Sequence, residues 1–297
     1  MKKGGDNNEK DAVYQAAESG NKTPSQAESA QYLPGTQQLP LRWLYRVKEN
    51  VIISLTLFFM NKLIQKICND IKEQYKQDKN VLGIMLFGSA ARNKFDQYSD
   101  IDIYILLNKK GKFSRLNFIK NRIRVDIIFN TIKEAREYLK KDKNALKRIT
   151  SHMTAYGVIV FQRGETLKKI QFIAKNNLQS KTKYKSSEIL MHKYSVDDFL
   201  GEVQRDAQNK DYLAFGLDGH LLVKNIVELF LKLNGEFLRQ PNEMFGLLNK
   251  LDSDFCGILK DFYKENNIDR KKNILEKLVK YIYKKSGGPL PQQWKVL

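Results

Sequence analysis

Cysteine, histidine and proline are scarce in this chain of 297 residues, which contains two, three and six of them. Two cysteines exclude a disulfide-stapled scaffold and a zinc site built from several cysteines, so we expect a reducing, cytoplasmic environment. Long apolar runs are missing as well. The run Val51–Met60 is about half as long as the roughly 20 residues that a membrane helix needs. The N-terminal region also lacks the pattern of a signal peptide, and we expect no membrane partner.

Acidic residues are outnumbered, with 33 Asp and Glu against 52 Lys and Arg, which gives a formal net charge of +19. Such an excess favours an anionic partner such as nucleic acid. However, no block of five or six like charges forms a basic tail. A basic cleft for an anionic small ligand, such as a nucleoside triphosphate, explains the charge equally well.

Residues 1–40 are rich in Gln, Ser, Asn and Gly and poor in apolar residues, which predicts disorder. Val51–Met60 is either a buried strand or helix turn, or part of a dispensable extension. An amphipathic helix is expected directly after Met60, because four apolar residues share one face. These residues are Leu63, Ile64, Ile67 and Ile71. We therefore predict that residues 1–59 are disordered or dispensable and that the natural protein begins at Met60.

Two kinds of pattern divide the rest of the chain. Short apolar runs between turns predict strands at Val81–Phe87, Asp100–Leu107, Arg122–Phe129 and, at an edge, Val158–Phe161. Helices are expected among them at Ala90–Lys94, Thr131–Lys141 and Asn144–Tyr156, and Lys112–Lys120 is ambiguous. After Gly164 only helical periodicity remains, at Glu165–Asn176, Ser195–Gln208, Leu213–Leu233, Glu243–Leu251, Phe255–Glu265 and Asn273–Tyr283. The predicted fold class is α+β, with a small mixed sheet and flanking helices in 60–165 and an all-helical domain in 166–297.

Residues suited to phosphate and metal chemistry follow the first two strands. Gly88 and Ser89 come at the end of an apolar strand and before a short helix, where backbone N–H groups can bind an anion. Asp100 and Asp102 are two residues apart on the next strand, so both carboxylates project from the same face. A cation would relieve their repulsion, and carboxylate oxygens with substrate phosphates are the ligands that suit Mg²⁺.

Asp126 is a lone acid in the apolar strand Arg122–Phe129. A buried charge is costly without a partner. That partner is either a metal shared with the other two carboxylates or a nearby arginine, Arg122 or Arg124. Three carboxylates beside a phosphate-binding turn point to two-metal phosphoryl or nucleotidyl transfer.

The segment Leu86–Ile103 resembles the nucleotidyltransferase motif of the DNA polymerase beta superfamily: an apolar strand, Gly-Ser, about ten residues and Asp-apolar-Asp. The resemblance implies a nucleotidyltransferase domain at 60–165 and two Mg²⁺ ions, for which Mn²⁺ could substitute. It further implies metal-binding and catalytic roles for Asp100, Asp102 and Asp126, and a role for Gly88 and Ser89 in cradling the β- and γ-phosphates.

Other side chains are expected at the edges of this site. Arg92 and Lys94 follow the Gly-Ser turn and could reach the triphosphate, although a solvated helix face explains them as well. In the helical half, Asp198 and Glu202 lie opposite an apolar stripe and are candidates for binding a cationic or polyhydroxyl acceptor. A solvated face with internal ion pairs is the alternative for these two residues.

The expected function is transfer of a nucleoside monophosphate from an NTP, with ATP as the expected donor, to a hydroxyl of a small molecule. An α/β half followed by a helical half resembles the kanamycin and lincosamide antibiotic-modifying nucleotidyltransferases, which makes an antibiotic the leading acceptor. One alternative is a nucleotidyltransferase that acts on a protein, as an antitoxin-like AMPylating enzyme, or on an RNA end. A second alternative is a nucleotide-binding module without catalysis.

Overall fold

A computed structural model describes residues 62–295, which fall within one compact unit of the chain. The predicted extension 1–59 and the Val51–Met60 run lie outside these residues. The amphipathic helix expected after Met60 is confirmed over 62–75, where Ile64, Ile67 and Ile71 are buried. No helix in the described part is long and apolar enough to cross a membrane.

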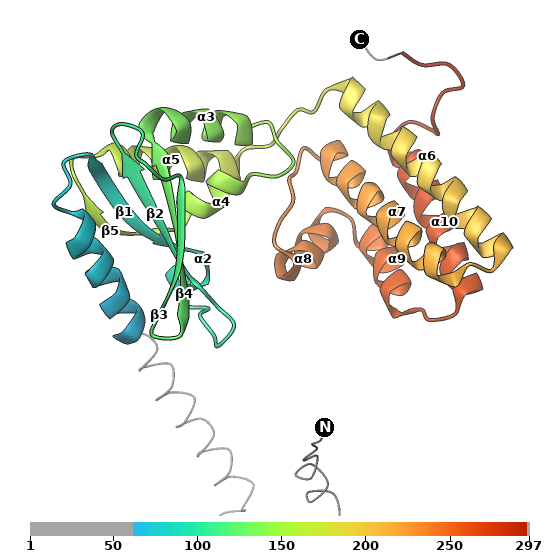
Figure 1. The fold of residues 1–297 in the computed structure, drawn as a ribbon. Coiled ribbons are helices and arrows are strands. Elements are labelled where there is room, and N and C mark those ends of the chain that lie inside the picture. The colour runs from blue at the N-terminus through green and yellow to red at the C-terminus, as the bar shows by residue number, and fades with distance from the viewer. Residues whose placement is uncertain (1–61, 296–297) are drawn as a thin grey trace, which may run out of the picture. The chain divides into compact units, whose positions relative to one another are not determined.

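A five-stranded mixed sheet forms the centre of the N-terminal half (Figure 1). The strands are β1 (Val81–Phe87), β2 (Ile101–Leu107), β3 (Arg115–Lys120), β4 (Ile123–Thr131) and β5 (Val158–Gln162). Their order across the sheet is β3-β4-β2-β1-β5, and β2 pairs with β4 in parallel while the other neighbours are antiparallel. The apolar runs of β1, β2 and β4 suit the three central strands, which are covered on both faces.

Helices cover both faces of the sheet. Those of this half are 62–75, α2 (Gly88–Ala91), α3 (Ile132–Asp142), α4 (Ile149–Ala155) and α5 (Thr166–Gln179). The helix 62–75 packs on the face that carries Ile103 and Ile105 of β2. The helices α3, α4 and α5 pack on the opposite face, around Tyr104 and Leu106. Asp102 lies near the start of β2, on the same face as Tyr104 and Leu106.

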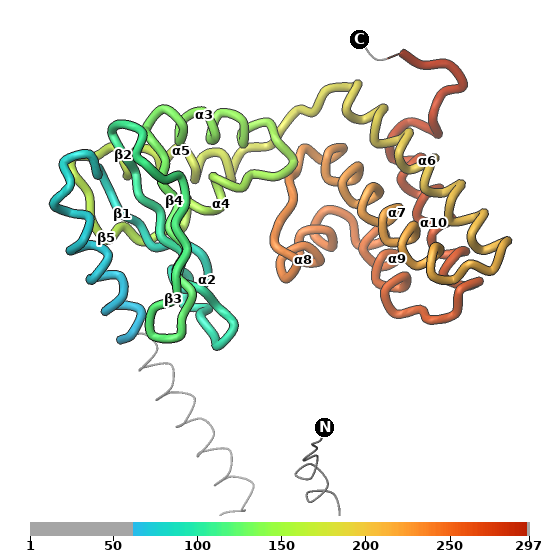
Figure 2. The backbone as a smooth tube through the Cα atoms, in the orientation of Figure 1, coloured from blue at the N-terminus to red at the C-terminus, as the bar shows by residue number. Residues whose placement is uncertain are grey.

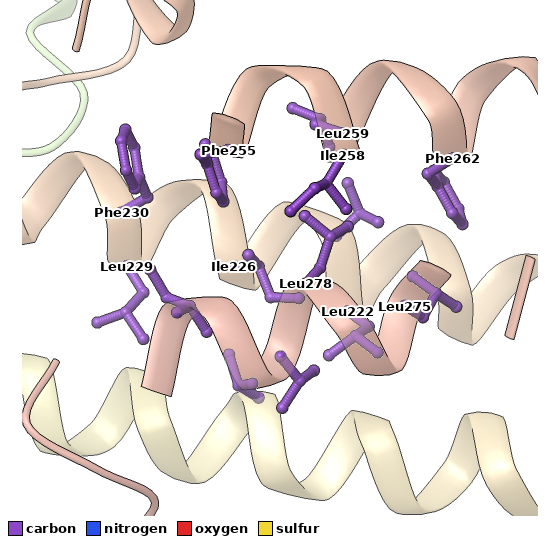
Figure 3. Packing of buried hydrophobic residues seen from close by; sticks show 14 of the residues in the cluster. Leu222, Ile226, Leu229, Phe230, Phe255, Ile258, Leu259, Phe262, Leu275 and Leu278 are labelled. Carbon is purple, nitrogen blue, oxygen red and sulfur yellow. The ribbon is translucent and has the colours of Figure 1, made fainter. Parts of the chain in front are cut away.

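The C-terminal half is a bundle of helices around its own core. These helices are α6 (Ser186–Asn209), α7 (Tyr212–Leu233), α8 (Pro241–Leu251), α9 (Ser253–Lys264) and α10 (Ile268–Lys285). Phe230 of α7 stacks on Phe255 of α9 with ring centroids 4.0 Å apart (Figure 3). Leu222, Ile226 and Leu278 continue this core along α7 and α10.

The connection between the halves is held by a buried arginine. Arg148 is 1% exposed, and its guanidinium donates to the carbonyl of Ser180 (2.9 Å) and to that of Asn177. It also lies over the ring of Phe237, 4.0 Å from the centroid. Leu238 N donates to Leu146 O at 2.9 Å. Residues after α7 are thereby fixed against residues before α4.

The structure confirms the predicted α+β class, with a mixed sheet followed by helices. The ambiguous segment is β3. Three helix predictions were wrong at their starts by five residues or more: α4 begins at Ile149 rather than Asn144, α6 at Ser186 rather than Ser195, and α10 at Ile268 rather than Asn273. The helix α5 buries Leu167 and Ile170 in the cluster on the sheet. The boundary at 165/166 remains a prediction.

Candidate active site

Two of the three carboxylates predicted from the sequence, Asp102 and Asp126, lie on one rung of the sheet. Asp102 of β2 is the register partner of Phe87 of β1 on one side and of Asp126 of β4 on the other. Asp126 is in turn opposite Asn117 of β3. The rung therefore orders the groups as the end of β1 with Gly88, then Asp102, then Asp126, then Asn117. Register partners on adjacent strands project from the same face, so Asp102, Asp126 and Asn117 face one space.

Gly88 brings the backbone against the Asp102 carboxylate. Its φ of +72° is in the left-handed region, and a Cβ here would lie inside the van der Waals surface of Asp102 Oδ2. Only glycine meets both conditions without strain. The short helix α2 starts at Gly88, and the side chain of Arg92 returns to it, with Nε donating to Gly88 O at 3.1 Å. The predicted strand–Gly-Ser–helix turn is thus formed, directly beside Asp102.

Asp102 is strongly perturbed. Burial, followed by the charges of Asp100 and Asp126, raises the pKa of Asp102 to about 7, against smaller opposing effects of Arg115 and Arg92. The charges of Asp100 and Asp126 therefore lie close enough to Asp102 to disfavour its ionisation. A perturbed carboxylate of this kind marks a candidate functional site.

Asp126 already has partners from its own chain. The side chain of Arg115 donates from Nε to Asp126 Oδ1 at 2.8 Å and from Nη2 to Oδ2 at 2.6 Å. Asn117 Nδ2 donates to Asp126 Oδ1 at 2.9 Å. Asp126 is only 4% exposed, so these contacts compensate its buried charge. The expectation that Arg122 or Arg124 would pair with it was wrong, because strand β3 brings Arg115 over the carboxylate instead.

These contacts decide which oxygens suit a divalent cation. Among residues 62–295, no three acidic, histidine or cysteine side chains form a group ready to hold a metal ion. Asp100 and Asp102 fit one by chemistry, because a cation would relieve the repulsion that raises the pKa of Asp102. Asp126 fits only when Arg115 and Asn117 release its oxygens.

On the Gly88 side of the rung, two cavities hold a group of basic side chains. A cavity of about 180 Å³ is lined by Gly88, Arg92 and His152 among others. A neighbouring cavity of about 640 Å³ shares Arg92 and His152 and adds Lys175 and Arg239. The guanidinium of Arg239 is held over Phe237, 3.5 Å from the ring centroid. Basic groups beside the Gly-Ser turn suit a polyphosphate.

His152 belongs to the same space. Its Nε2 is buried and has no hydrogen-bond partner within residues 62–295. Burial, together with the charge of Arg239, lowers the pKa of His152, so the ring is neutral near pH 7. The structure places His152 on two cavity walls, and its free nitrogen can accept or donate one hydrogen bond to a bound ligand.

On the Asp126 side, two further cavities adjoin the carboxylates. One of about 450 Å³ is lined by Asp100, Arg115, Asn117, Arg124 and Asp126 among others. A second of about 480 Å³ lies between the loop 95–100 and the β3–β4 turn, which Figure 2 shows at the same end of the sheet. The carboxylates thus lie between two open spaces.

Residues 69–166 match the family model for "Polymerase beta, Nucleotidyltransferase". The chain therefore carries a nucleotidyltransferase domain of the polymerase beta family. The match confirms the resemblance drawn from the Gly88–Asp102 motif, and it covers the rung and Asp100. No curated protein matches the chain. Among solved structures, a nucleotidyltransferase-like protein from Exiguobacterium sibiricum 255-15 is 13% identical, with a TM-score of 0.46 over 74% of this chain and 75% of that chain.

Three predicted site residues lie apart from the rung or have other contacts. Lys94 is an exposed side chain after α2, and its backbone N donates to Ser89 O at 3.0 Å. Glu202 accepts from Arg205 of its own helix at 2.6 Å, and Asp198 is exposed. The cavities beside the nucleotidyltransferase carboxylates are lined by other residues. An acceptor role for Asp198 and Glu202 remains a prediction.

Several residues of the nucleotidyltransferase site were missed from the sequence. Arg115 and Asn117 lie in the segment that was left ambiguous, and Lys175 and Arg239 lie among many other basic residues. A period-two pattern in 115–120 is the signal that could have found the first pair, because alternate exposed residues of an edge strand face the carboxylates. Nothing in the local sequence distinguishes Lys175 or Arg239.

Proposed function

We propose that this protein transfers a nucleoside monophosphate from an NTP, with ATP as the expected donor, to a hydroxyl of a small-molecule acceptor. The supporting observation is the rung itself: the glycine turn at the end of β1, then Asp102, then Asp126 across the sheet, with Asp100 two residues before Asp102 in the chain. This order separates a phosphate-binding side at Gly88 from a side at Asp126 that is open to a second substrate. A nucleotidyl transfer needs its leaving group and its attacking hydroxyl on opposite sides of the α-phosphate.

The donor is expected on the Gly88 side. Backbone N–H groups at Gly88 and Ser89 would bind the β- and γ-phosphates, and Arg92, Lys175 and Arg239 would neutralise them. His152 is placed to hold one phosphate oxygen or a sugar hydroxyl. In this arrangement, the cations bind the pyrophosphate that leaves and so stabilise the transition state.

The carboxylates would hold Mg²⁺, with Mn²⁺ as a substitute. Asp100 and Asp102 would carry the ion shared with the triphosphate, and Asp126, once released by Arg115, would serve a second ion on the acceptor side. Bound Mg²⁺ neutralises the triphosphate and polarises the α-phosphate. The oxygen of the acceptor hydroxyl bonds to the α-phosphorus, the bond from this phosphorus to the bridging oxygen breaks, and pyrophosphate leaves. Asp126, which lines the cavity of about 450 Å³ on the acceptor side, is the proposed acceptor of the hydroxyl proton.

The direct test is to incubate the full chain with each NTP labelled at its α-phosphate, with Mg²⁺ or Mn²⁺, and with a panel of acceptors. The panel contains an aminoglycoside, a lincosamide, phosphorylated sugars, RNA and protein. We expect label from ATP in a small molecule and none with Asp100→Asn. Label in RNA or protein alone would support an alternative acceptor. A failure of every NTP to label any acceptor, or retention of transfer by Asp100→Asn, would contradict the proposal.

A further inference from the structure

We propose that the acceptor carries a phosphate group beside its reacting hydroxyl and that Arg122 and Arg124 bind this group. The inference depends on the proposed function for one point, that the Asp126 side of the rung is the acceptor side. It concerns the chemistry of the acceptor, which the nucleotidyltransferase domain by itself leaves open.

Arg122 and Arg124 line the cavities on the Asp126 side of the rung. The two cavities share Asp100 and Arg124 as lining residues. A molecule that fills either cavity therefore lies beside the carboxylate of Asp100 and the guanidinium of Arg124 at once. Arg122 lines the second cavity, in the turn that joins β3 to β4. Both arginines thus border a cavity that also contains a carboxylate of the candidate metal site.

Arg122 and Arg124 differ from Arg115 in their charge partners. Within residues 62–295, no carboxylate lies within ion-pair distance of Arg122 or Arg124, whereas Arg115 is committed to Asp126. The other acid in the second cavity, Asp96, accepts hydrogen bonds from Tyr98 N (3.0 Å) and Ser99 Oγ (2.8 Å). Two unpaired guanidiniums next to an open cavity favour an anion with several oxygens, because each fork can donate two parallel hydrogen bonds to it.

The β3–β4 turn that carries Arg122 has an unusual backbone conformation. Asn121 and Arg122 have φ values of 51° and 65°, so both are left-handed, as a two-residue hairpin turn requires. Glycine is the favoured residue at the second position of such a turn, and an arginine there is strained. The chain nevertheless presents a guanidinium at the rim of this cavity. A role for Arg122 in holding a ligand accounts for that choice.

Two exposed side chains of the protein offer a surface to the non-phosphate part of the acceptor. The side chain of Tyr98 is 88% exposed and lines the second cavity, and Ile119, which is 74% exposed, lines the first. An exposed aromatic ring next to arginines suits a flat or ring-shaped moiety such as a base or a sugar. A polycationic aminoglycoside would instead meet guanidiniums in both cavities, which disfavours it as the acceptor.

The experiment compares matched probes by calorimetry on the full chain in Mg²⁺, with α,β-methylene-ATP added to fill the donor side. Ribose 5-phosphate and ribose differ only by the phosphate. A short single-stranded oligoribonucleotide tests a phosphate that belongs to a strand, and kanamycin is the cationic probe. The variants are Arg122→Gln and Arg124→Gln. Arg270→Gln, an exposed arginine of α10, removes the same charge elsewhere.

We expect the phosphate-bearing probes to bind at least about tenfold more tightly than ribose, and Arg124→Gln to abolish most of that preference. Arg270→Gln should keep it, and all three variants should keep the thermal midpoint of the parent. Tight binding of ribose 5-phosphate assigns a small phosphorylated acceptor, and binding of the oligoribonucleotide alone assigns the phosphate to an RNA end. Equal affinity for ribose and the phosphate-bearing probes, tighter binding of kanamycin, or full preference in Arg124→Gln would overturn the inference. Failure of the proposed function is a separate result, because it would be seen as absent label transfer from every NTP, whereas the phosphate preference is measured without transfer.

Discussion

Arg115 and Asp126 form a two-point ion pair across the β3–β4 ladder, with donor–acceptor distances of 2.8 and 2.6 Å. Asp126 is buried and Arg115 is mostly exposed, so the arginine side chain lies between the carboxylate and solvent. The pairing also raises the pKa of Arg115, and the charges of Asp102 and Asp100 add to this effect. In the absence of a metal ion, the guanidinium of Arg115 therefore provides a positive charge beside Asp126, Asp102 and Asp100.

Replacement of Arg115 tests this relationship. Arg115→Gln should lower the melting temperature of the protein in EDTA, because Asp126 loses a charged partner and keeps only Asn117. Added Mg²⁺ should stabilise the variant more than it stabilises the parent, because the oxygens of Asp126 are then free for the ion. Thermal melts with EDTA and with Mg²⁺ measure both effects.

The matched control is Arg124→Gln on the neighbouring strand, which removes the same charge without breaking an ion pair. We expect no change in its thermal midpoint in either condition. If Arg115→Gln were as stable as this control, or if both gained equally from Mg²⁺, the guanidinium would not compensate Asp126.

Asp102 makes the stability of the metal-free protein depend on pH. Its pKa is raised from 3.8 to about 7, so the folded state holds the proton longer than the unfolded chain. Stability should therefore fall as the pH rises through this interval and stay lower above it. Asp102→Asn is neutral throughout, so it should melt at a higher temperature than the parent at about pH 8 and at the same temperature near pH 4. Nucleotidyl transfer by this variant should fall by about a thousandfold or more.

The pKa of Asp96, in the same region, is shifted in the opposite direction from that of Asp102. Hydrogen bonds from Ser99 and Tyr98 lower the pKa of Asp96, so its ionised form stabilises the folded state. Asp96→Asn should lower the melting temperature at about pH 8, where Asp102→Asn raises it. A gain for both variants, or a gain from Asp102→Asn that persists at pH 4, would contradict the assignment of repulsion to Asp102.

The donor side can be tested at Lys175. Lys175→Met should weaken Mg-ATP binding by about tenfold, because one charged contact to the triphosphate is lost. Lys169→Met on the same helix is the control, since Lys169 is exposed and lines neither of the two cavities described beside Gly88. Equal affinities of the two variants, measured by calorimetry, would remove Lys175 from the site.

The central strands could be predicted because burial on both faces requires an almost continuous apolar run, which is easy to find in the sequence. Val81–Phe87 was placed as the structure has it, and Ile101–Leu107 to within one residue, since each is a short apolar run bounded by turns. Asp100 and Asp102 could be assigned to one face from their spacing, and Asp126 could be placed in a buried strand. Asp126 lies on a rung with Asp102. Their shared rung could not be predicted, because it depends on the parallel register of β2 and β4.

The misplaced and ambiguous elements have a common physical reason: polar side chains in or next to them make tertiary contacts that local periodicity does not show. Lys193 is buried in the first half of α6, where its Nζ donates to Gly288 O at 2.8 Å, and it interrupts the apolar stripe that would have indicated the helix start. Arg148 is buried before α4 and bonds carbonyls about thirty residues later in the chain. In β3, the polar residues Arg115 and Asn117 made the edge strand hard to predict, because their side chains bind the carboxylate of Asp126 on β4. In each case the deciding contact is distant in sequence.

Gly88 is the position where backbone conformation and chemistry depend on each other most directly. Gly88→Ala would impose two costs: a left-handed φ on a residue with a Cβ, and a collision of that Cβ with Asp102 Oδ2. The first cost is about 1–2 kcal/mol. Gly164→Ala isolates it, because Gly164 has a φ of +63° and no atom within 4 Å of the Cβ site. Gly88→Ala should therefore be less stable than Gly164→Ala, by an amount that measures the close approach of the turn to the carboxylate. It should also lose Mg-ATP binding, because Asp102 must move away from the Gly-Ser turn, whereas Gly164→Ala should bind as the parent does. Melting and calorimetry on the two variants decide the matter: equal stability with intact binding would mean that the backbone at Gly88 does not define the position of Asp102.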